Sequence, residues 1–245
     1  MTKVAKVINK GAEKAKSAGS KSELFYLKTL LKWLDTLDSE GGIISLPSAS
    51  DFARLNASLK EAAKNASDKI KGVIDKTVNI LAKDEKGAIP TKEMKRYRSE
   101  VLNFSKENDK IIQAVHAKTV FGIKRSDLRT TLKNVVNGLI VEKVAKSIID
   151  YFHQSHRVIL IKKSKKNNLE HFIYTNSLID TSRDFCIHRA GKAFTMKETE
   201  DWVNDPELPI SDKWKATYNP LLHMGGFNCR HFPKFITKET YDRIK

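Results

Sequence analysis

The sequence predicts an α+β fold: a mostly helical N-terminal region with long helices, followed by a small mixed domain with a β-hairpin. Apolar residues recur at steps of three and four up to about residue 153, which is the helical period. Residues 157–163 (RVILIKK) and 170–176 (EHFIYTN) then read as two strands around a polar turn. The 245 residues, 40% of them hydrophobic, suffice for one large domain or two small ones.

Apolar stripes predict four helices, at residues 22–38, 51–83, 92–116 and 126–153. Residues 1–20 carry only a weak stripe, and Gly11 and Gly19 weaken any helix there. We therefore expect residues 1–20 to be a basic flexible arm, or a segment that orders only on a partner. The rest of the chain is predicted to form a helical domain at 21–155 and a small α+β domain at 156–245.

Two capping sequences mark helix starts. Ser50 is a plausible N-cap for the long helix that begins near residue 51. Thr195 and Glu198 have the spacing of a capping box and precede Trp202. This box predicts a short helix over about 196–204.

The net charge of +16 is unevenly distributed. Residues 181–245 hold 11 Lys/Arg and 9 Asp/Glu, whereas residues 1–180 hold 34 against 20. Such a basic surface favours a polyanion, namely nucleic acid, an anionic membrane or an acidic protein, although a merely solvated lysine-rich surface has the same composition. No run of about 18 apolar residues occurs, so we expect no membrane partner.

The two cysteines each lie two positions before a histidine, as Cys186/His188 and Cys229/His231. Paired thiol and imidazole groups that are far apart in sequence are how small zinc sites are assembled, so these four residues are the candidate zinc ligands. Two alternatives remain: both cysteines are small buried hydrophobes, or they form a disulfide. So few cysteines favour synthesis in a reducing cytosol.

No catalytic centre is evident, and we expect no enzyme activity. The chain has no paired carboxylates with a pocket signature, no nucleophile elbow and no phosphate-binding glycine loop. The order of His223, Asn228 and His231 faintly resembles a ββα-metal nuclease, but the spacing is too tight for strand–strand–helix. A small metal-dependent nuclease is therefore the weakest of the alternatives.

Ordered features of residues 170–235 resemble the C-terminal domain of the phage Mu F-like minor head proteins. In that family a tyrosine-containing strand precedes an acidic residue, a Ser-Arg turn, Phe-Cys, Gly-Lys-x-Phe-Thr, a short helix with a tryptophan, and Gly-Gly-Phe-Asn-Cys-Arg-His. The matching residues are Tyr174, Asp180, Ser182, Arg183, Phe185, Cys186, Gly191, Lys192, Phe194, Thr195, Trp202, Gly225, Gly226, Asn228, Cys229, Arg230 and His231. Many members have Cys-x-x-Cys and Cys-Arg-Cys where this chain has Cys-Ile-His and Cys-Arg-His.

The resemblance implies a minor capsid protein of a tailed bacteriophage. Such a protein is associated with the portal vertex inside the head and acts in head morphogenesis or in genome packaging and ejection. Its partners would be the portal protein and other head proteins, and packaged double-stranded DNA through the basic helical region. Its location would be the virion, and the host cytoplasm during assembly. An internal DNA-binding virion protein is the nearest alternative.

Arg183 and Arg230 both lie in turns close to a cysteine. Two interpretations are open: both are surface charge, or they donate hydrogen bonds to carbonyl groups, or to Asp180 and Asp184, and so fix the turns of a small domain with little core.

Overall fold

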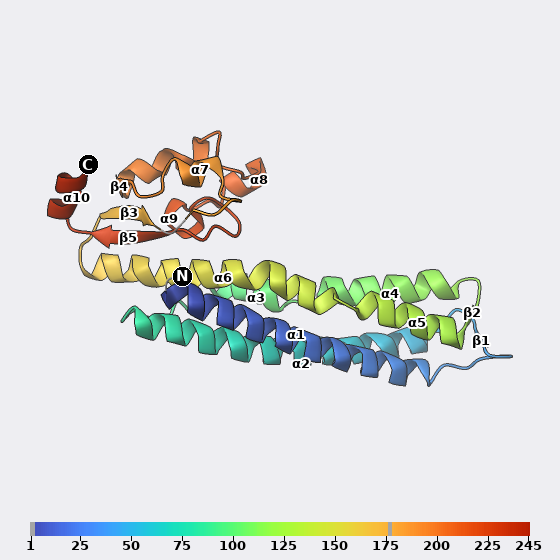
Figure 1. Cartoon of the computed structure of the whole chain (residues 1–245). Coiled ribbons are helices and arrows are strands. Elements are labelled where there is room, and N and C mark those ends of the chain that lie inside the picture. The colour runs from blue at the N-terminus through green and yellow to red at the C-terminus, as the bar shows by residue number, and fades with distance from the viewer. Residues whose placement is uncertain (1–2, 176–177) are drawn as a thin grey trace. The chain divides into compact units, whose positions relative to one another are not determined.

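The computed structural model describes residues 3–175 and 178–245, which form long helices and small antiparallel sheets (Figure 1). The helices up to residue 166 are α1 (Lys3–Leu34), α2 (Ala49–Asp84), α3 (Lys95–Leu102), α4 (Ser105–Thr119), α5 (Arg125–Val136) and α6 (Leu139–Lys166). The strands are β1 (Ile43–Ile44), β2 (Ile123–Lys124), β3 (His171–Thr175), β4 (Ala193–Thr195) and β5 (Phe232–Ile236). The later helices are α7 (Asp184–Ile187), the 3₁₀ helix η1 (Lys197–Asn204), α8 (Asp212–Lys215), α9 (Pro220–His223) and α10 (Lys238–Ile244). The predicted α+β class is confirmed.

The chain divides into two compact units. The first, here called the sheet unit, contains the chain up to Ile8, Lys76–Arg96 and Ile149–Lys245. The second, the helical unit, contains Asn9–Asp75 and Tyr97–Ile148. Four helices, α1, α2, α3 and α6, therefore contribute residues to both units, and the predicted boundary at residue 155 lies inside α6.

The predicted flexible arm is wrong for residues 3–20, which are the first part of α1; Met1 and Thr2 lie outside the described residues. The buried face of this segment carries small residues at helical spacing, among them Gly11, Ala12, Ala15 and Gly19. A Cβ at Gly19 would lie 3.5 Å from the backbone of Val141 on α6. Within the helical unit, these small residues let two helix backbones approach closely. Tertiary packing thus offsets the low helix propensity of glycine.

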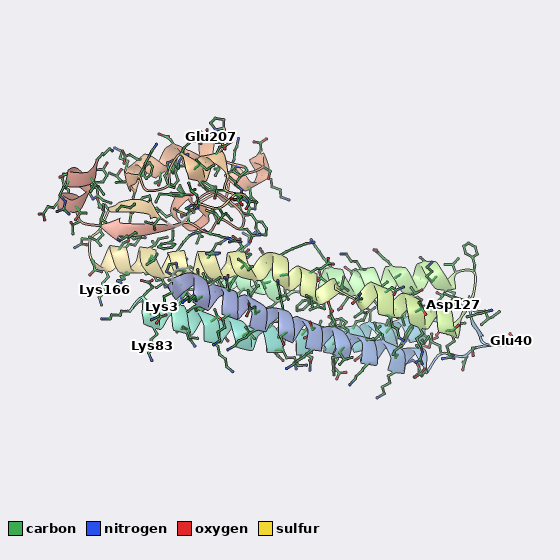
Figure 2. The ribbon with its side chains drawn as sticks, in the orientation of Figure 1. Lys3, Glu40, Lys83, Asp127, Lys166 and Glu207 are labelled. Carbon is green, nitrogen blue, oxygen red and sulfur yellow. The ribbon has the colours of Figure 1, made fainter. Side chains whose placement is uncertain are left out.

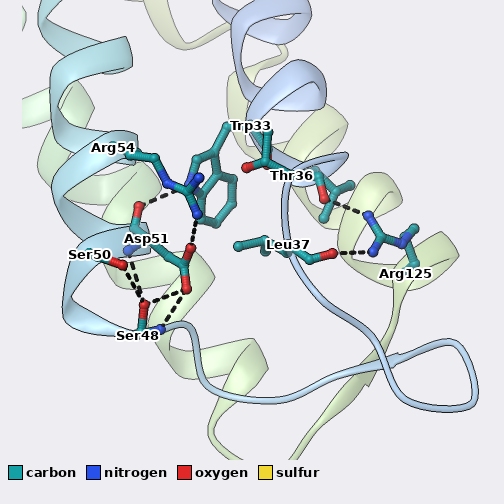
Figure 3. A network of polar contacts seen from close by, with 9 residues as sticks. Trp33, Thr36, Leu37, Ser48, Ser50, Asp51, Arg54 and Arg125 are labelled. Atoms are coloured by element: carbon teal, nitrogen blue, oxygen red, sulfur yellow. Dashed lines mark hydrogen bonds and ion pairs between the residues drawn. The ribbon is translucent and has the colours of Figure 1, made fainter.

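A polar network fixes the turn between α1 and α2 within the helical unit (Figure 3). The Trp33 indole N–H donates to the Asp51 carbonyl at 2.9 Å. Arg125, at the start of α5, donates to the carbonyls of Leu34 and Leu37. The predicted N-cap Ser50 is replaced by Ser48, whose hydroxyl accepts from the Asp51 N–H at 3.2 Å while its own N–H donates to the Asp51 carboxylate at 2.9 Å. Because α2 begins at Ala49, Ser50 already lies within the helix.

The predicted β-hairpin is also wrong. Residues 157–163 continue α6, and β3 pairs antiparallel with β4 and β5 in the order β4-β3-β5. Every residue of α6 from 150 to 159 is buried, because the helix is covered on more than one side within the sheet unit. Residues 158–161 are all apolar, and so short an apolar run cannot be assigned to a helix or a strand by its period alone. Asn176, the last residue of the second predicted strand, lies outside the described residues.

Two other predicted helices are each divided in two. The segment predicted at 92–116 contains α3 and α4, separated at Asn103 and Phe104. The segment predicted at 126–153 contains α5 and the start of α6, separated at Gly138, whose φ of 78° few other residues adopt without strain. Among residues 3–175 and 178–245, no helix is long and apolar enough to cross a membrane.

Candidate metal centre

Four polar side chains from three parts of the chain meet inside the sheet unit. Tyr174 lies on the central strand β3, Cys186 lies in α7, and Cys229 and His231 come from the segment before β5. The two Sγ atoms are 3.8 Å apart, and the Cys229 Sγ lies 3.7 Å from Nδ1 of His231. The Tyr174 hydroxyl lies 3.2 Å from the Cys186 Sγ and 3.7 Å from the Cys229 Sγ.

The core of the small domain encloses this cluster. Cys186 and Cys229 are each 3% exposed and His231 is 4% exposed. The surrounding buried residues are Phe172, Phe185, Trp202, Leu208 and Met224. Six of the residues that carry the phage-protein resemblance (Tyr174, Phe185, Cys186, Trp202, Cys229 and His231) are therefore part of one buried cluster and its immediate surroundings.

Gly225 is required for the close approach of chain segments at the cluster. A Cβ on this residue would lie 2.3 Å from the Cys186 Sγ and 3.4 Å from both the Cys229 Sγ and the Tyr174 hydroxyl. No side chain can occupy this space unless the Cys186 Sγ moves away. The first glycine of the Gly-Gly pair thus serves the cluster, and the second, Gly226, adopts a φ of 91° in the turn.

Arg157 of α6 fixes the backbone on either side of Cys229, and sequence reasoning missed it. Its side chain is fully buried, and it donates to the carbonyls of His231 at 2.8 Å, of Leu222 at 2.7 Å and of Cys229. Two turns earlier on α6, the carboxylate of Asp150 accepts from the Asn228 N–H at 2.8 Å. Asn228 has a φ of 57°, which asparagine tolerates better than most residues.

A signal for this pair was available in the sequence. Asp150 and Arg157 are seven residues apart and so lie on one face of a helix. The strand predicted from residue 157 onward instead puts the two residues on different elements.

Arg183 behaves as predicted. It donates to the carbonyl of Gly225 at 2.8 Å and to that of Phe227 at 2.7 Å, so it joins the α7 turn to the glycine turn. Ser182 closes the preceding turn, where its hydroxyl accepts from the Ile179 N–H at 2.8 Å. Asp180 and Arg230 are exposed.

The remaining motif residues have structural positions. Lys192 is exposed, and its carbonyl accepts from the Tyr174 N–H at 2.9 Å. Gly191 precedes it with a φ of 78°, and its N–H donates to the Tyr174 carbonyl at 2.8 Å. The predicted capping box is confirmed: the Glu198 N–H donates to the Thr195 hydroxyl at 3.1 Å and the Thr195 N–H donates to the Glu198 carboxylate at 2.6 Å.

His188 lies outside the cluster. Its side chain is 58% exposed, and its Nδ1 is 2.8 Å from a carboxylate oxygen of Glu207. Two positions along a helix correspond to about 200° of rotation, so Cys186 and His188 point to opposite sides of α7. Cys229 and His231 have the same spacing in non-helical chain, where alternate residues share a side, and both point into the core.

His223 is also separate from the cluster. Its Nδ1 accepts from the Asn219 N–H at 2.8 Å, and burial, together with the charge of Arg157, lowers its pKa to about 4. It supports the short helix α9 and does not join Asn228 and His231 in the arrangement that a nuclease would need.

The two thiols have opposite protonation preferences. Their mutual hydrogen bond lowers the pKa of Cys229 well below its usual value, and His231 and Arg157 act in the same direction. That hydrogen bond, together with burial, raises the pKa of Cys186 far above its usual value. The directions of the two pKa shifts favour a proton on Cys186 over one on Cys229. Paired cysteine sulfurs beside an imidazole are ligands that suit a soft metal cation.

The distances match those expected of metal ligands. With zinc–sulfur bonds of about 2.3 Å and zinc–nitrogen bonds of about 2.0 Å, a tetrahedral site separates two sulfurs by roughly 3.8 Å and a sulfur from a nitrogen by roughly 3.6 Å. The observed separations are 3.8 Å and 3.7 Å. In this arrangement Nδ1 of His231 is the ligand atom, because it is the ring nitrogen that lies 3.7 Å from the Cys229 Sγ. Cys186, Cys229 and His231 are thus a group that can hold a metal ion.

A cleft of about 310 Å³ reaches the same three residues from outside. Ser182, Asn228 and Arg230 are among the residues that line the rest of it. No protein-family model, curated protein or solved structure matches this chain.

Proposed function

We propose that this protein is a minor head protein of a tailed bacteriophage, of the phage Mu F-like kind, associated with the portal vertex inside the head. The observation that carries the proposal is the convergence of the motif residues. Between Tyr174 and His231 they are spread over much of the small domain, yet the central ones form a single buried cluster. Motif residues that form one core are more specific than a likeness of scattered residues, and this supports the proposal.

The test is co-expression of a tagged copy with the portal protein encoded near it. After nuclease treatment, the two proteins should co-purify at physiological salt. A portal protein from an unrelated phage is the control and should be lost in the wash. If this chain binds neither portal, or binds both equally, the minor head assignment is wrong.

In the same proposal, the ion held by Cys186, Cys229 and His231 is zinc. Thiolate and imidazole ligands favour zinc over magnesium or calcium, which prefer oxygen. The ion would hold α7 and the segment before β5 together in a domain whose elements are short. Elemental analysis of the purified chain should give one zinc per molecule. Less than a tenth of that amount, after purification without chelators, would exclude a zinc protein.

A specific surface favours DNA contact as a second candidate function. In the sheet unit, the start of α1, the end of α2 with the following loop, and the end of α6 are rich in lysine; Lys3, Lys83 and Lys166 show this in Figure 2. The three acidic groups here, Asp84, Glu85 and Glu93, are paired with Lys3, Lys163 and Lys162. Seven exposed lysines in the described part of this surface have no acidic partner: Lys6, Lys83, Lys86, Lys92, Lys95, Lys165 and Lys166.

Binding to duplex DNA should therefore weaken steeply with salt, by roughly 0.9 log units per log unit of salt for each phosphate contact. In a variant with Lys83, Lys86, Lys165 and Lys166 replaced by Gln, about three to four phosphate contacts should be lost. The slope of log affinity against log salt should become shallower accordingly. The matched control removes four exposed lysines of the helical unit: Lys14, Lys16, Lys60 and Lys64. Equal loss in both variants would mean that net charge, and not this surface, binds DNA.

A further inference from the structure

We infer that the hydroxyl of Tyr174, and not His188, completes a closed four-ligand site with Cys186, Cys229 and His231. This inference rests on the proposal that the cluster holds zinc. It assigns to the tyrosine a role that the spacing of cysteines and histidines in the sequence does not indicate.

The first support is distance. A zinc–oxygen bond of about 2.0 Å and a zinc–sulfur bond of about 2.3 Å place an oxygen and a sulfur of one tetrahedron roughly 3.5 Å apart. The Tyr174 hydroxyl lies 3.2 Å and 3.7 Å from the two sulfurs. Together with the sulfur–sulfur and sulfur–nitrogen separations, four edges of the tetrahedron lie near their expected lengths.

The second support is that Tyr174 is held in this position. Its backbone pairs with Pro233 of β5 on one side and with Gly191 and Lys192 on the other. Its side chain is fully buried, and its ring lies against those of His231, at 4.9 Å between centroids, and Trp202, at 5.8 Å. The hydroxyl is therefore oriented by the fold before any ion binds, as a ligand of a structural site should be.

The third support is that no other candidate reaches the cluster. The group of cysteine, histidine and carboxylate side chains close enough to share an ion, among the described residues, consists of Cys186, Cys229 and His231. His188 would have to leave Glu207 and reverse its direction across α7. The absence of a Cβ at Gly225, in contrast, leaves room for the tyrosine oxygen and both sulfurs to meet.

A closed site has a functional consequence. Zinc with four protein ligands is structural, whereas catalytic zinc keeps one position for water or substrate. The cleft lined by Cys186, Cys229 and His231 would then reach the ligands without offering a free position on the ion. An ion in such a closed site stabilises the fold and differs from the hydrolytic ion that a metal-dependent nuclease would need.

The test uses the full chain loaded with Co²⁺, whose visible absorption reports the number and kind of ligands. Wild type and the variant His188→Ala should give the same intense spectrum of a tetrahedral site and the same Co²⁺ affinity. Tyr174→Phe, which keeps the ring and removes only the oxygen, should shift the spectrum and weaken Co²⁺ binding about tenfold or more. Added azide should change the spectrum of Tyr174→Phe and leave that of wild type unchanged.

The possible results distinguish failure of the zinc proposal from failure of the tyrosine ligand. No Co²⁺ binding by wild type, with circular dichroism showing a folded chain, refutes the zinc proposal and this inference with it, but leaves the portal-binding test unaffected. Co²⁺ binding with an unchanged spectrum in Tyr174→Phe refutes the tyrosine ligand alone, as does loss of binding in His188→Ala. If Tyr174→Phe does not fold, the azide titration of wild type still decides, because a response to azide means an open position.

Discussion

The helical unit and the small domain after residue 170 are held together in different ways. In the helical unit, long helices bury continuous apolar stripes; α1 buries small residues such as Ala15 in its first part and large ones such as Tyr26 and Leu30 in its last part. In the small domain the elements are only three to eight residues long, and buried polar groups connect them. When one contact is removed from the helical unit, its many neighbouring contacts still hold the helices together. When one buried polar contact is removed from the small domain, the segments that it joins come apart.

Arg157 offers the strongest test of this contrast. Arg157→Met should lower the free energy of unfolding by about 3–5 kcal/mol, because three carbonyls of the buried chain lose their donor. Lys162→Met is the matched control, since Lys162 lies on the same helix and forms only a part-exposed ion pair with Glu93. In urea unfolding, Lys162→Met should lower the free energy of unfolding by no more than about 1 kcal/mol. Equal effects of the two substitutions would show that Arg157 has no special role.

Acid should destabilise the region around Arg157. Burial, helped by the positive charge of Arg157, lowers the pKa of His153 from 6.5 to about 3. The unfolded chain therefore binds this proton below pH 6.5 while the folded chain does not bind it until about pH 3, so stability falls as the pH drops through that window. His153 alone should account for a loss on the order of 3 kcal/mol between pH 7 and pH 4.

His153→Gln should remove that part of the pH dependence in urea unfolding measured at both pH values. His188→Gln is the control, because the side chain of His188 is 58% exposed. If His153→Gln leaves the slope of stability against pH unchanged, His153 is not the group that acid titrates.

Replacing a glycine with alanine should have opposite effects on stability in the two regions, and these effects should be smaller than that of Arg157→Met. Gly225→Ala should destabilise by about 1–3 kcal/mol and weaken metal binding, because its Cβ would overlap the Cys186 Sγ. Gly72→Ala, in the middle of α2 with nothing within 4 Å, should instead stabilise by up to about 1 kcal/mol. Thermal melting with and without a chelator measures both effects, and a harmless Gly225→Ala would contradict the tight packing of the cluster.

The same contrast explains what the sequence could predict. The stripes of residues 51–83 located α2 to within a few residues, and the capping box located η1, because both are local patterns. The predictions of a flexible arm and of a hairpin were wrong because both segments depend on tertiary contacts. Gly19 packs against Val141, and α6 is enclosed on more than one side. The cysteines and His231 could be chosen as ligands by residue type, but only the backbone conformation shows that His188 points away and that Tyr174 points inward.

The two capping boxes provide the finest comparison, since the same motif occurs once in each region. Ser48→Ala at the start of α2 and Thr195→Ala at the start of η1 should each cost about 1 kcal/mol. The longer helix has many other contacts that preserve its first turn, whereas η1 is eight residues long and carries Trp202 of the metal-centre core. Thr195→Ala should therefore also weaken zinc binding, measured by competition with a chromophoric chelator, and Ser48→Ala should not. Equal zinc affinity in both variants would mean that the core around Trp202 does not depend on its helix cap.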